Sequence, residues 1–256
     1  MKRLIGLLVP VFVFALGIEH AGATAFDFTS LNGGVQGSLG TNSVTTGGVT
    51  ATGWSSTGGA FSTANLNLWL RNTPNDHGLG ICTTIENTFP GSGGCAGQGG
   101  DYNELSNELT FEVLALDRGT TTTGWTSVFI SSLDNNGVAG GPVEQGTLYW
   151  ANNSGDPNTA NTGVTSFTFS FGIFGAGNEG NILAFAPAAA ASARYLFFTS
   201  GPEVTDSLTD PIGGNNDYLV WKGVTADVIP EPASLLLLGS GLVGLATRAR
   251  RRFRTM

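Results

Sequence analysis

The chain has 256 residues, of which 39 are glycine and only 12% are charged, and its formal net charge is −8. Between Phe26 and Ile229 there are four basic and 17 acidic residues, a net charge of −13 that argues against nucleic acid as a partner. Threonine, serine and asparagine are abundant and strong helix formers are sparse outside the two ends, which predicts many short strands and turns.

The N-terminal residues have the pattern of a secretory signal peptide. Lys2 and Arg3 precede an apolar stretch over residues 4–18, and small residues at 21–23 and 23–25 form two cleavage patterns. We therefore expect export through the Sec machinery. The signal peptide is assigned to residues 1–25 and is removed by cleavage after Ala23 or after Ala25. Residues 26–227 then form one β-type domain, long enough for a hydrophobic core.

Segments that alternate between apolar and polar residues predict strands along this domain. The clearest covers residues 108–117, where we expect Phe111 and Val113 to face the core and Thr110 and Glu112 to face solvent. Further strands are expected at residues 64–70, 125–133, 146–151, 164–174, 194–199 and 218–228. Residues 184–193, broken by Pro187, predict a loop or a short helical turn.

An Asn135-Asn136-Gly137 turn separates two of these strands. An Asn-Gly step tolerates positive φ at both residues, so we expect strands 125–133 and 146–151 to pair as a hairpin. Eight or more short strands with little helix predict an all-β fold, an antiparallel β-sandwich of jelly-roll type. An N-terminal signal helix and one C-terminal hydrophobic helix are expected to flank it.

Cys82 and Cys95 are the only cysteines. An even pair in an exported chain predicts a disulfide, and closing a loop of this length stabilises the fold by about 3 kcal/mol. A zinc site with two cysteines and two histidines is impossible, because His77 is the only histidine after the signal peptide.

The C-terminal residues 228–256 combine three features in a fixed order. The polar motif Pro230-Glu231-Pro232-Ala233-Ser234 leads into an uncharged apolar segment, residues 233–247. An arginine cluster follows, formed by Arg248, Arg250, Arg251, Arg252 and Arg254. Arginines beside an apolar segment stay on the cytoplasmic side of a membrane, and a segment shorter than the roughly 17–25 residues of a span predicts a transient anchor in the inner membrane. The Gly-x-Gly-x-x-Gly pattern at residues 239–244 lies inside this segment and is no dinucleotide site, since no strand precedes it.

These three parts resemble the PEP-CTERM sorting signal of Gram-negative bacterial envelope proteins. The resemblance implies processing by an exosortase, a membrane-embedded transpeptidase-like enzyme that cuts near the Pro-Glu-Pro motif, in bacteria that make extracellular polysaccharide. It implies an exported protein of the cell envelope, cell surface or extracellular space. The resemblance further implies a structural or adhesive role in the extracellular matrix or biofilm, alongside exopolysaccharide.

Two sets of acidic residues before the strand at 108–117 suggest other chemistry. Asp101, Asn103 and Glu104 offer the oxygen ligands that calcium prefers, although solvated turn residues have the same composition. Glu104 and Glu108 resemble the Glu-x-Asp-x-Glu arrangement of laminarinase-type glycoside hydrolases, but Ser106 replaces the central aspartate. Without that carboxylate nothing evident separates the two pKa values, so a glycan-cleaving enzyme is only the third hypothesis.

Trp69 lies opposite the leucine face of its strand, where an exposed ring can stack on a sugar, unless a loop covers it. Serine hydrolysis through His77 lacks a Gly-x-Ser-x-Gly motif. The sequence thus predicts a non-enzymatic protein without a cofactor, apart from calcium. The alternative is a carbohydrate-binding module, with calcium supporting its site.

Overall fold

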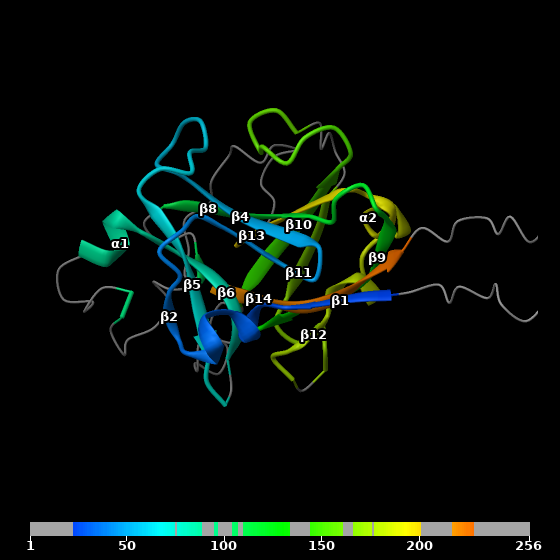
Figure 1. The fold of residues 1–256 in the computed structure, drawn as a ribbon, viewed down its shortest axis with the longest axis horizontal. Helices are drawn as coiled ribbons and strands as arrows, with labels where there is room; N and C mark the ends of the chain where they lie inside the picture. Colours follow the sequence, from blue (N-terminus) through cyan, green and yellow to red (C-terminus); the bar gives the residue numbers. More distant parts are fainter. Residues whose placement is uncertain are drawn as a thin grey trace, which may run out of the picture. The chain divides into compact units, whose positions relative to one another are not determined.

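The computed structural model describes residues 23–74, 76–88, 95–96, 104–106, 110–133, 144–160, 166–175, 177–200 and 217–227 (Figure 1). Ala23–Ala226 form one compact unit. The predicted signal helix, the sorting motif, the hydrophobic helix and the arginine cluster lie outside the described residues.

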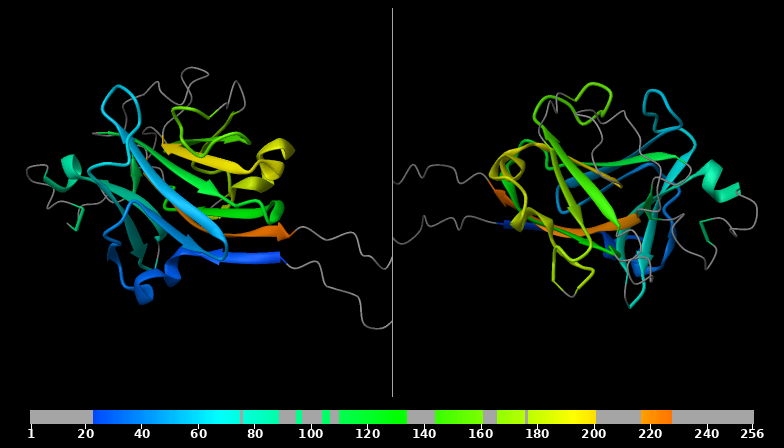
Figure 2. Two further views of the ribbon diagram at one scale, coloured as in Figure 1. Left: turned by 45° about the horizontal axis from the view of Figure 1, so that its top comes forward. Right: turned by 180° about the vertical axis from the view of Figure 1, so that it is seen from behind.

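Two antiparallel sheets make up the described fold (Figure 2). The larger has the strand order β12-β9-β14-β6-β5-β2, with β1 and β7 also paired to β14. Its strands are β1 (Ala23–Asp27), β2 (Gly37–Ser38), β5 (Leu66–Asn72), β6 (His77–Thr83), β7 (Leu105–Ser106), β9 (Thr122–Ser131), β12 (Gly180–Asn181) and β14 (Asp217–Asp227).

The smaller sheet has the order β11-β10-β13-β8-β4-β3. Its strands are β3 (Ser43–Thr46), β4 (Val49–Ser56), β8 (Phe111–Asp117), β10 (Gln145–Ala151), β11 (Ser166–Ser170) and β13 (Tyr195–Ser200). The short helices are η2 (Phe28–Gly34), α1 (Thr84–Thr88), η4 (Ile182–Ala184) and α2 (Ala188–Ser192). The predicted all-β character is confirmed, and the jelly-roll connectivity stays a prediction.

The main hydrophobic core draws side chains from both sheets, in a sandwich-like arrangement. Leu68 on β5 and Val220 on β14 belong to it together with Leu114 on β8 and Leu148 on β10, and all four are fully buried. The leucine face expected for residues 64–70 is confirmed, since Leu66, Leu68 and Leu70 all lie in this core.

Strand β8 is buried on both of its faces, which corrects one expectation from the sequence. Val113 lies in a second apolar cluster, on the other side of the sheet from the main core, together with Tyr149 and Tyr195. Glu112 shares the face of Leu114, which points into the main core, and it is 1% exposed. The alternation of side chains along β8 was predicted correctly. Because both faces of the strand carry apolar residues, the sequence did not show which face lies between the sheets.

The predicted hairpin of strands 125–133 and 146–151 is wrong. The corresponding strands belong to different sheets: β9 lies between β12 and β14, whereas β10 lies between β11 and β13. An Asn-Gly step lowers the cost of a turn but does not determine which strand becomes a neighbour, because that depends on long-range packing.

The first and last strands of the unit are partners. β1 pairs with β14 from Ala23 opposite Ala226 to Asp27 opposite Lys222. The first strand therefore begins at Ala23, three residues before the Phe26 expected from the sequence. At Asp27 the chain turns into η2, because the Asp27 side chain accepts a hydrogen bond from Thr29 N at 2.9 Å and caps that helix.

Candidate functional site

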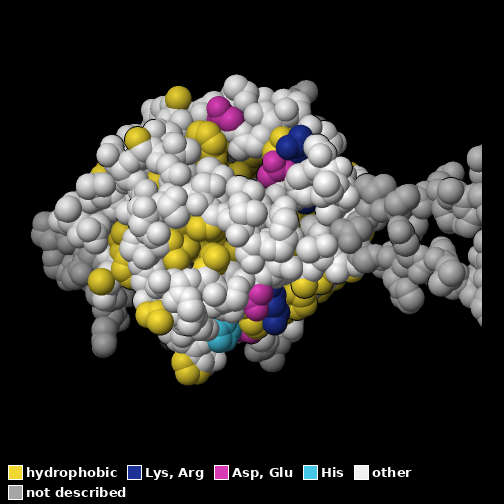
Figure 3. Space-filling view, viewed as in Figure 1, with side chains coloured by type: hydrophobic (Ala, Val, Ile, Leu, Met, Phe, Trp, Pro, Cys, Tyr) yellow, Lys and Arg dark blue, Asp and Glu magenta, His cyan; other side chains and the backbone are white. Residues whose placement is uncertain are grey.

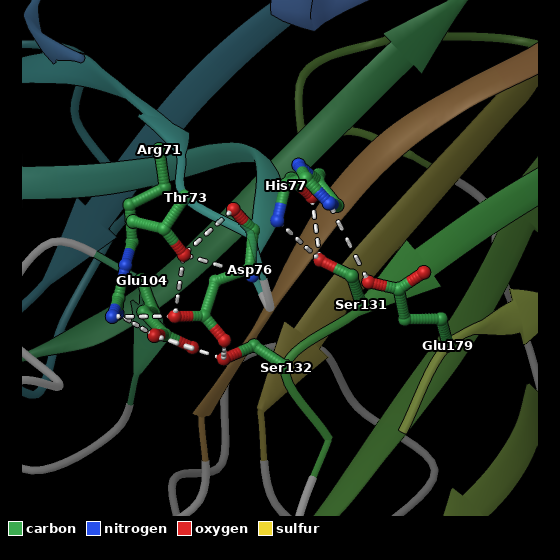
Figure 4. Close-up of polar contacts among 8 residues, drawn as sticks. All are labelled: Arg71, Thr73, Asp76, His77, Glu104, Ser131, Ser132 and Glu179. Carbon is green, nitrogen blue, oxygen red and sulfur yellow. Dashed lines mark hydrogen bonds and ion pairs between the residues drawn. The ribbon is translucent and has the colours of Figure 1, made fainter. Parts of the chain in front are cut away.

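A polar network around Arg71 joins four parts of the chain (Figure 4). Arg71 lies on β5, Asp76 precedes β6, Glu104 precedes β7 and Ser132 follows β9. Arg71 Nη2 lies 2.9 Å from Asp76 Oδ2, and Arg71 Nη1 is ion-paired with Glu104 Oε1. Ser132 Oγ lies between the carboxylates, 3.1 Å from Asp76 Oδ1 and 3.0 Å from Glu104 Oε1. We call these four residues the arginine network.

The local backbone holds the arginine network in place. Ser132 has a φ of 66°, a left-handed conformation that is uncommon for serine. Thr73 Oγ1 accepts a hydrogen bond from Asp76 N at 3.0 Å, which closes the turn between β5 and β6. Glu104 is 3% exposed, so removing Arg71 would leave Glu104 as a buried charge without its ion-pair partner.

Glu104 is the one predicted calcium ligand within the described residues, since Asp101 and Asn103 lie outside them. Its Oε2 is buried and has no hydrogen-bond partner among the residues that the structure describes. Within the same ranges, no group of three or more His, Cys, Asp and Glu side chains is placed to hold a metal ion. A calcium site at Glu104 therefore depends on Asp101 and Asn103, and it stays a prediction.

His77 packs against an aromatic ring beside this network. It stacks on Trp221 with ring centroids 4.8 Å apart, and its Nε2 lies 3.9 Å from Glu179 Oε1. Ser131 exchanges hydrogen bonds with the backbone of His77: its Oγ accepts from His77 N at 3.0 Å and donates to His77 O at 2.5 Å. Ser131 thus does not provide the hydroxyl-to-imidazole contact of a serine hydrolase.

Trp69 is covered rather than exposed. The structure contains the predicted disulfide between Cys82 and Cys95, and Trp69 packs against both cysteines with 9% of its surface exposed. This matches the alternative in which a loop covers the ring. A role for Trp69 in stacking on a sugar stays a prediction that would require this cover to open.

Two glutamates that the sequence analysis did not single out lie against each other in the interior. Glu86 on α1 is fully buried and Glu112 on β8 is 1% exposed. Glu86 Oε2 accepts from Thr83 N at 2.8 Å, and Glu112 Oε2 accepts from Ser106 N at 2.8 Å. Thr110 Oγ1 lies 3.4 Å from Glu86 Oε1 and 3.4 Å from Glu112 Oε1, and so links the two. We call Glu86 and Glu112 the acid pair.

Burial changes the protonation of the acid pair. It raises the pKa of Glu86, although hydrogen bonds from Thr83 partly offset the effect. It raises the pKa of Glu112 further above the usual range, because the charge of Glu86 and a hydrogen bond between the two carboxyls act in the same direction. Glu112 therefore keeps its proton to a higher pH than Glu86, and while protonated it can donate to the Glu86 carboxylate.

A surface pocket of about 450 Å³ adjoins the acid pair. Thr83 and Thr110, which hydrogen-bond to Glu86, also line this pocket. The rest of its lining is uncharged: Ser55, Ser56, Thr57, Ala60, Ser62, Ala64, Asn65, Thr84 and Ile85. The two threonines separate the buried carboxyls from the pocket, so the acid pair influences it through hydrogen bonds and not by direct contact.

Part of the acid pair was visible in the sequence. Thr83-x-x-Glu86 is a capping box, and its two reciprocal bonds are present: Thr83 N donates to Glu86 Oε2, and Glu86 N donates to Thr83 Oγ1 at 3.3 Å. Its contact with Glu112 had no local signal, because the two residues lie 26 positions apart. Glu108, the other predicted hydrolase carboxylate, lies outside the described residues.

Comparison with known proteins identifies the C-terminal residues. Residues 228–252 match the PEP-CTERM protein-sorting motif. The chain carries a PEP-CTERM sorting signal. No curated protein and no solved structure matches the chain. The match begins directly after β14, which ends at Asp227.

The PEP-CTERM motif indicates exosortase-dependent sorting to the cell envelope or surface, with an exosortase as the processing partner. The matched range includes the Pro230-Glu231-Pro232 core and Arg248 to Arg252. In the part of the chain that the structure describes, no helix is long and apolar enough to cross a membrane.

Proposed function

We propose that this protein is a non-enzymatic component of the extracellular matrix or biofilm, delivered across the inner membrane and released to structural or adhesive work alongside exopolysaccharide. The PEP-CTERM motif at residues 228–252 carries the proposal, because it sets the destination. The surface is compatible with a hydrated polysaccharide environment: on the face in Figure 3, charged side chains are few and uncharged polar groups and backbone dominate.

The buried polar groups support a role without catalysis. Glu104 is held by Arg71, and the acid pair is separated from the nearest pocket by Thr83 and Thr110. A carboxylate that acts as a general acid or base must reach the substrate within hydrogen-bond distance. The acid pair instead accepts hydrogen bonds from Thr83, Ser106 and Thr110, and so connects α1, β7 and the start of β8.

The test compares the full chain with a variant that lacks residues 228–256, each produced in a host with and without an exosortase. We expect the full chain to reach the surface or medium with a mass that lacks the arginine cluster, only when exosortase is present. A matched variant with the five tail arginines changed to glutamine keeps the motif and tests the cluster alone. Full-length protein with an intact tail at the surface of the exosortase host would contradict processing, and a gene deletion that leaves biofilm cohesion unchanged would contradict the structural role.

Carbohydrate binding is the second candidate function. It is favoured by one observation, a pocket on the second apolar cluster that is lined by Trp54 and Tyr195.

Calcium supports this function if Asp101, Asn103 and Glu104 bind it, since the buried Glu104 Oε2 has an open lone pair. Melting the protein in EDTA and in millimolar calcium tests the metal. We expect calcium to raise the melting temperature of the wild type by several degrees and to have no such effect on Glu104→Gln. Identical curves in EDTA and in calcium would contradict a calcium site.

A further inference from the structure

We propose that the pocket between Trp54 and Tyr195 binds one neutral sugar ring of an extracellular polysaccharide. The proposal rests on the second candidate function and assigns it a site other than Trp69. The pocket has a volume of about 300 Å³. Its lining residues are Thr50, Thr52, Trp54, Ala115, Asp117, Gly155, Asp156 and Tyr195, and we call them the aromatic pocket.

The sheet register brings these residues together on the side of the smaller sheet that bears the second apolar cluster. Thr50 on β4 and Tyr195 on β13 are both opposite Asp117 on β8, and Thr52 is opposite Ala115. The floor of the pocket is thus formed by three neighbouring strands. Gly155 and Asp156, in the segment after β10, form the remaining wall.

The segment after β10 is fixed over the sheet, so the pocket is preformed. Asn158 Oδ1 accepts a hydrogen bond from Phe61 N at 2.7 Å, and Asn158 Nδ2 donates to Phe61 O at 3.0 Å. Gly155 approaches Tyr195 closely, since a Cβ on Gly155 would lie 2.9 Å from Tyr195 Cε1. A preformed pocket binds its ligand without the entropy loss of ordering a loop.

Two aromatic side chains supply the apolar surface. A pyranose ring has apolar C–H faces, and aromatic rings with one polar end suit a ligand that is apolar on its faces and polar at its edges. The indole N–H of Trp54 is buried and has no acceptor among the described residues. Because that N–H has almost no accessible surface, Trp54 contributes its ring to the pocket rather than a hydrogen bond.

The charged groups of the pocket are arranged as fixed acceptors. Asp117 accepts from Arg194 Nε and Nη2, each at 3.0 Å, and from Gly119 N at 2.7 Å. Asp156 Oδ1 accepts from Asn158 N and from Asn158 Nδ2, each at 2.8 Å. Asp156 Oδ2 has no such bond within the described ranges, so it is free to accept from a sugar hydroxyl.

Charge selects a neutral ligand. Two carboxylates line the pocket, and Arg194 pairs with only one of them, Asp117. The domain also carries a net charge of −13 between Phe26 and Ile229. Both disfavour uronic acids and sulfated sugars by like-charge repulsion. The volume lies at the small end of the range for ligand pockets, which fits one ring of a longer chain.

The test is a titration of the full exported protein with soluble dextran, laminarin and galactomannan as neutral probes and alginate as the acidic one. Trp54→Ala removes one of the two rings that line the pocket, and we expect about tenfold weaker binding of the neutral polymer that wild type prefers. Asp156→Asn retains Oδ1 as an acceptor but makes the second position a donor, and we expect about tenfold weaker binding. Trp221→Ala is the matched control, because it also removes a partly buried indole ring and lies outside the pocket.

Each outcome decides a different point. If wild type binds none of the neutral probes, the carbohydrate-binding function itself is wrong. If wild type binds but Trp54→Ala and Asp156→Asn bind equally well, the function stands and this site is wrong. If alginate binds as tightly as the neutral polymers, the ligand class is wrong. Melting curves of the three variants separate loss of binding from loss of folding. Trp69→Phe tests whether Trp69, the ring predicted from the sequence, contributes to binding.

Discussion

The acid pair makes the stability of the domain depend on pH. The pKa of Glu86 and that of Glu112 are both raised above the ordinary value of 4.5, so the folded domain binds more protons than the unfolded chain. The stability contributed by the pair is fully present below about pH 4.5 and is lost as pH rises through the folded-state pKa values. The pair therefore makes the domain more stable in mildly acidic than in alkaline solution.

Replacing Glu112 with glutamine tests this directly. Glutamine cannot ionise and can still donate to Glu86, so Glu112→Gln should raise the free energy of unfolding at pH 8 by on the order of 1 kcal/mol and change little at pH 4.5. Urea denaturation at the two pH values measures the difference. A gain from Glu112→Gln of equal size at both pH values would refute the titration.

The arginine network predicts a large effect from a single side chain. Arg71→Met preserves much of the side-chain volume but leaves Asp76 and Glu104 without their cation, and Glu104 is 3% exposed. We expect a loss of about 3 kcal/mol, in the range measured when one partner of a buried ion pair is removed. Thermal melting gives the value. The double variant Arg71→Met with Glu104→Gln should recover part of it, and a single variant as stable as wild type would mean that the network contributes nothing.

At the scale of secondary structure, the pairing of β1 with β14 selects between the two predicted cleavage sites. Cleavage after Ala25 would remove Thr24 and Ala25, which lie opposite Thr225 and Val224. It would also remove Thr24 O, which accepts a hydrogen bond from Thr225 Oγ1 at 3.3 Å. We therefore expect the mature chain to begin at Thr24.

The mass of the exported protein measures the cleavage position. A variant that lacks residues 24 and 25 should be less stable by about 1–2 kcal/mol, because it loses at least two cross-strand positions. A Thr24→Ser variant keeps the backbone pairing and is the control. A mature chain that begins at Phe26 with full stability would show that the first half of β1 is dispensable.

Strands could be predicted from the sequence where apolar and polar residues alternate strongly. Their neighbours in the sheets could not be predicted in this way. The strands at 64–70, 146–151 and 194–199 appear as β5, β10 and β13 with bounds that differ by at most two residues. Alternation is a local consequence of the pleat, so it needs no knowledge of the neighbours. The partners of β9 and β10 depend on contacts far along the chain, and for these the local turn signal was misleading.

The candidate sites divide in the same way. The disulfide was predicted from the cysteine count and the expected compartment. The capping box of Glu86 was not predicted, although its four-residue pattern is present in the sequence. The aromatic pocket could not be found, because Trp54, Asp117 and Tyr195 meet only through the register of three strands. Trp69 was placed on the correct face, but the cysteine loop that packs against it comes from 13 or more residues further along.

For the whole molecule, folding and export are linked through the Cys82–Cys95 disulfide. It forms in an oxidising compartment, and its two cysteines pack against Trp69 in a small cluster of their own. The ends of the compact unit are also neighbours, since Ala23 lies opposite Ala226. Completing the larger sheet thus requires the last strand, immediately before the sorting motif, so β1 cannot find its partner until almost the whole chain has been exported.

Breaking the disulfide should expose this link. Reduction, or the double change Cys82→Ala with Cys95→Ala, is expected to lower the free energy of unfolding by about 3 kcal/mol, the entropy value for a loop of this length. The unreduced exported protein should not react with a thiol reagent, whereas protein retained in the cytoplasm should react at both cysteines. Because Trp69 packs on the bridge, its fluorescence should change on reduction, and Trp69→Phe isolates that signal from the other tryptophans. Thiol labelling of the exported, unreduced protein would show that the disulfide does not form. Equal stability with and without reductant would show that the disulfide does not stabilise the exported domain.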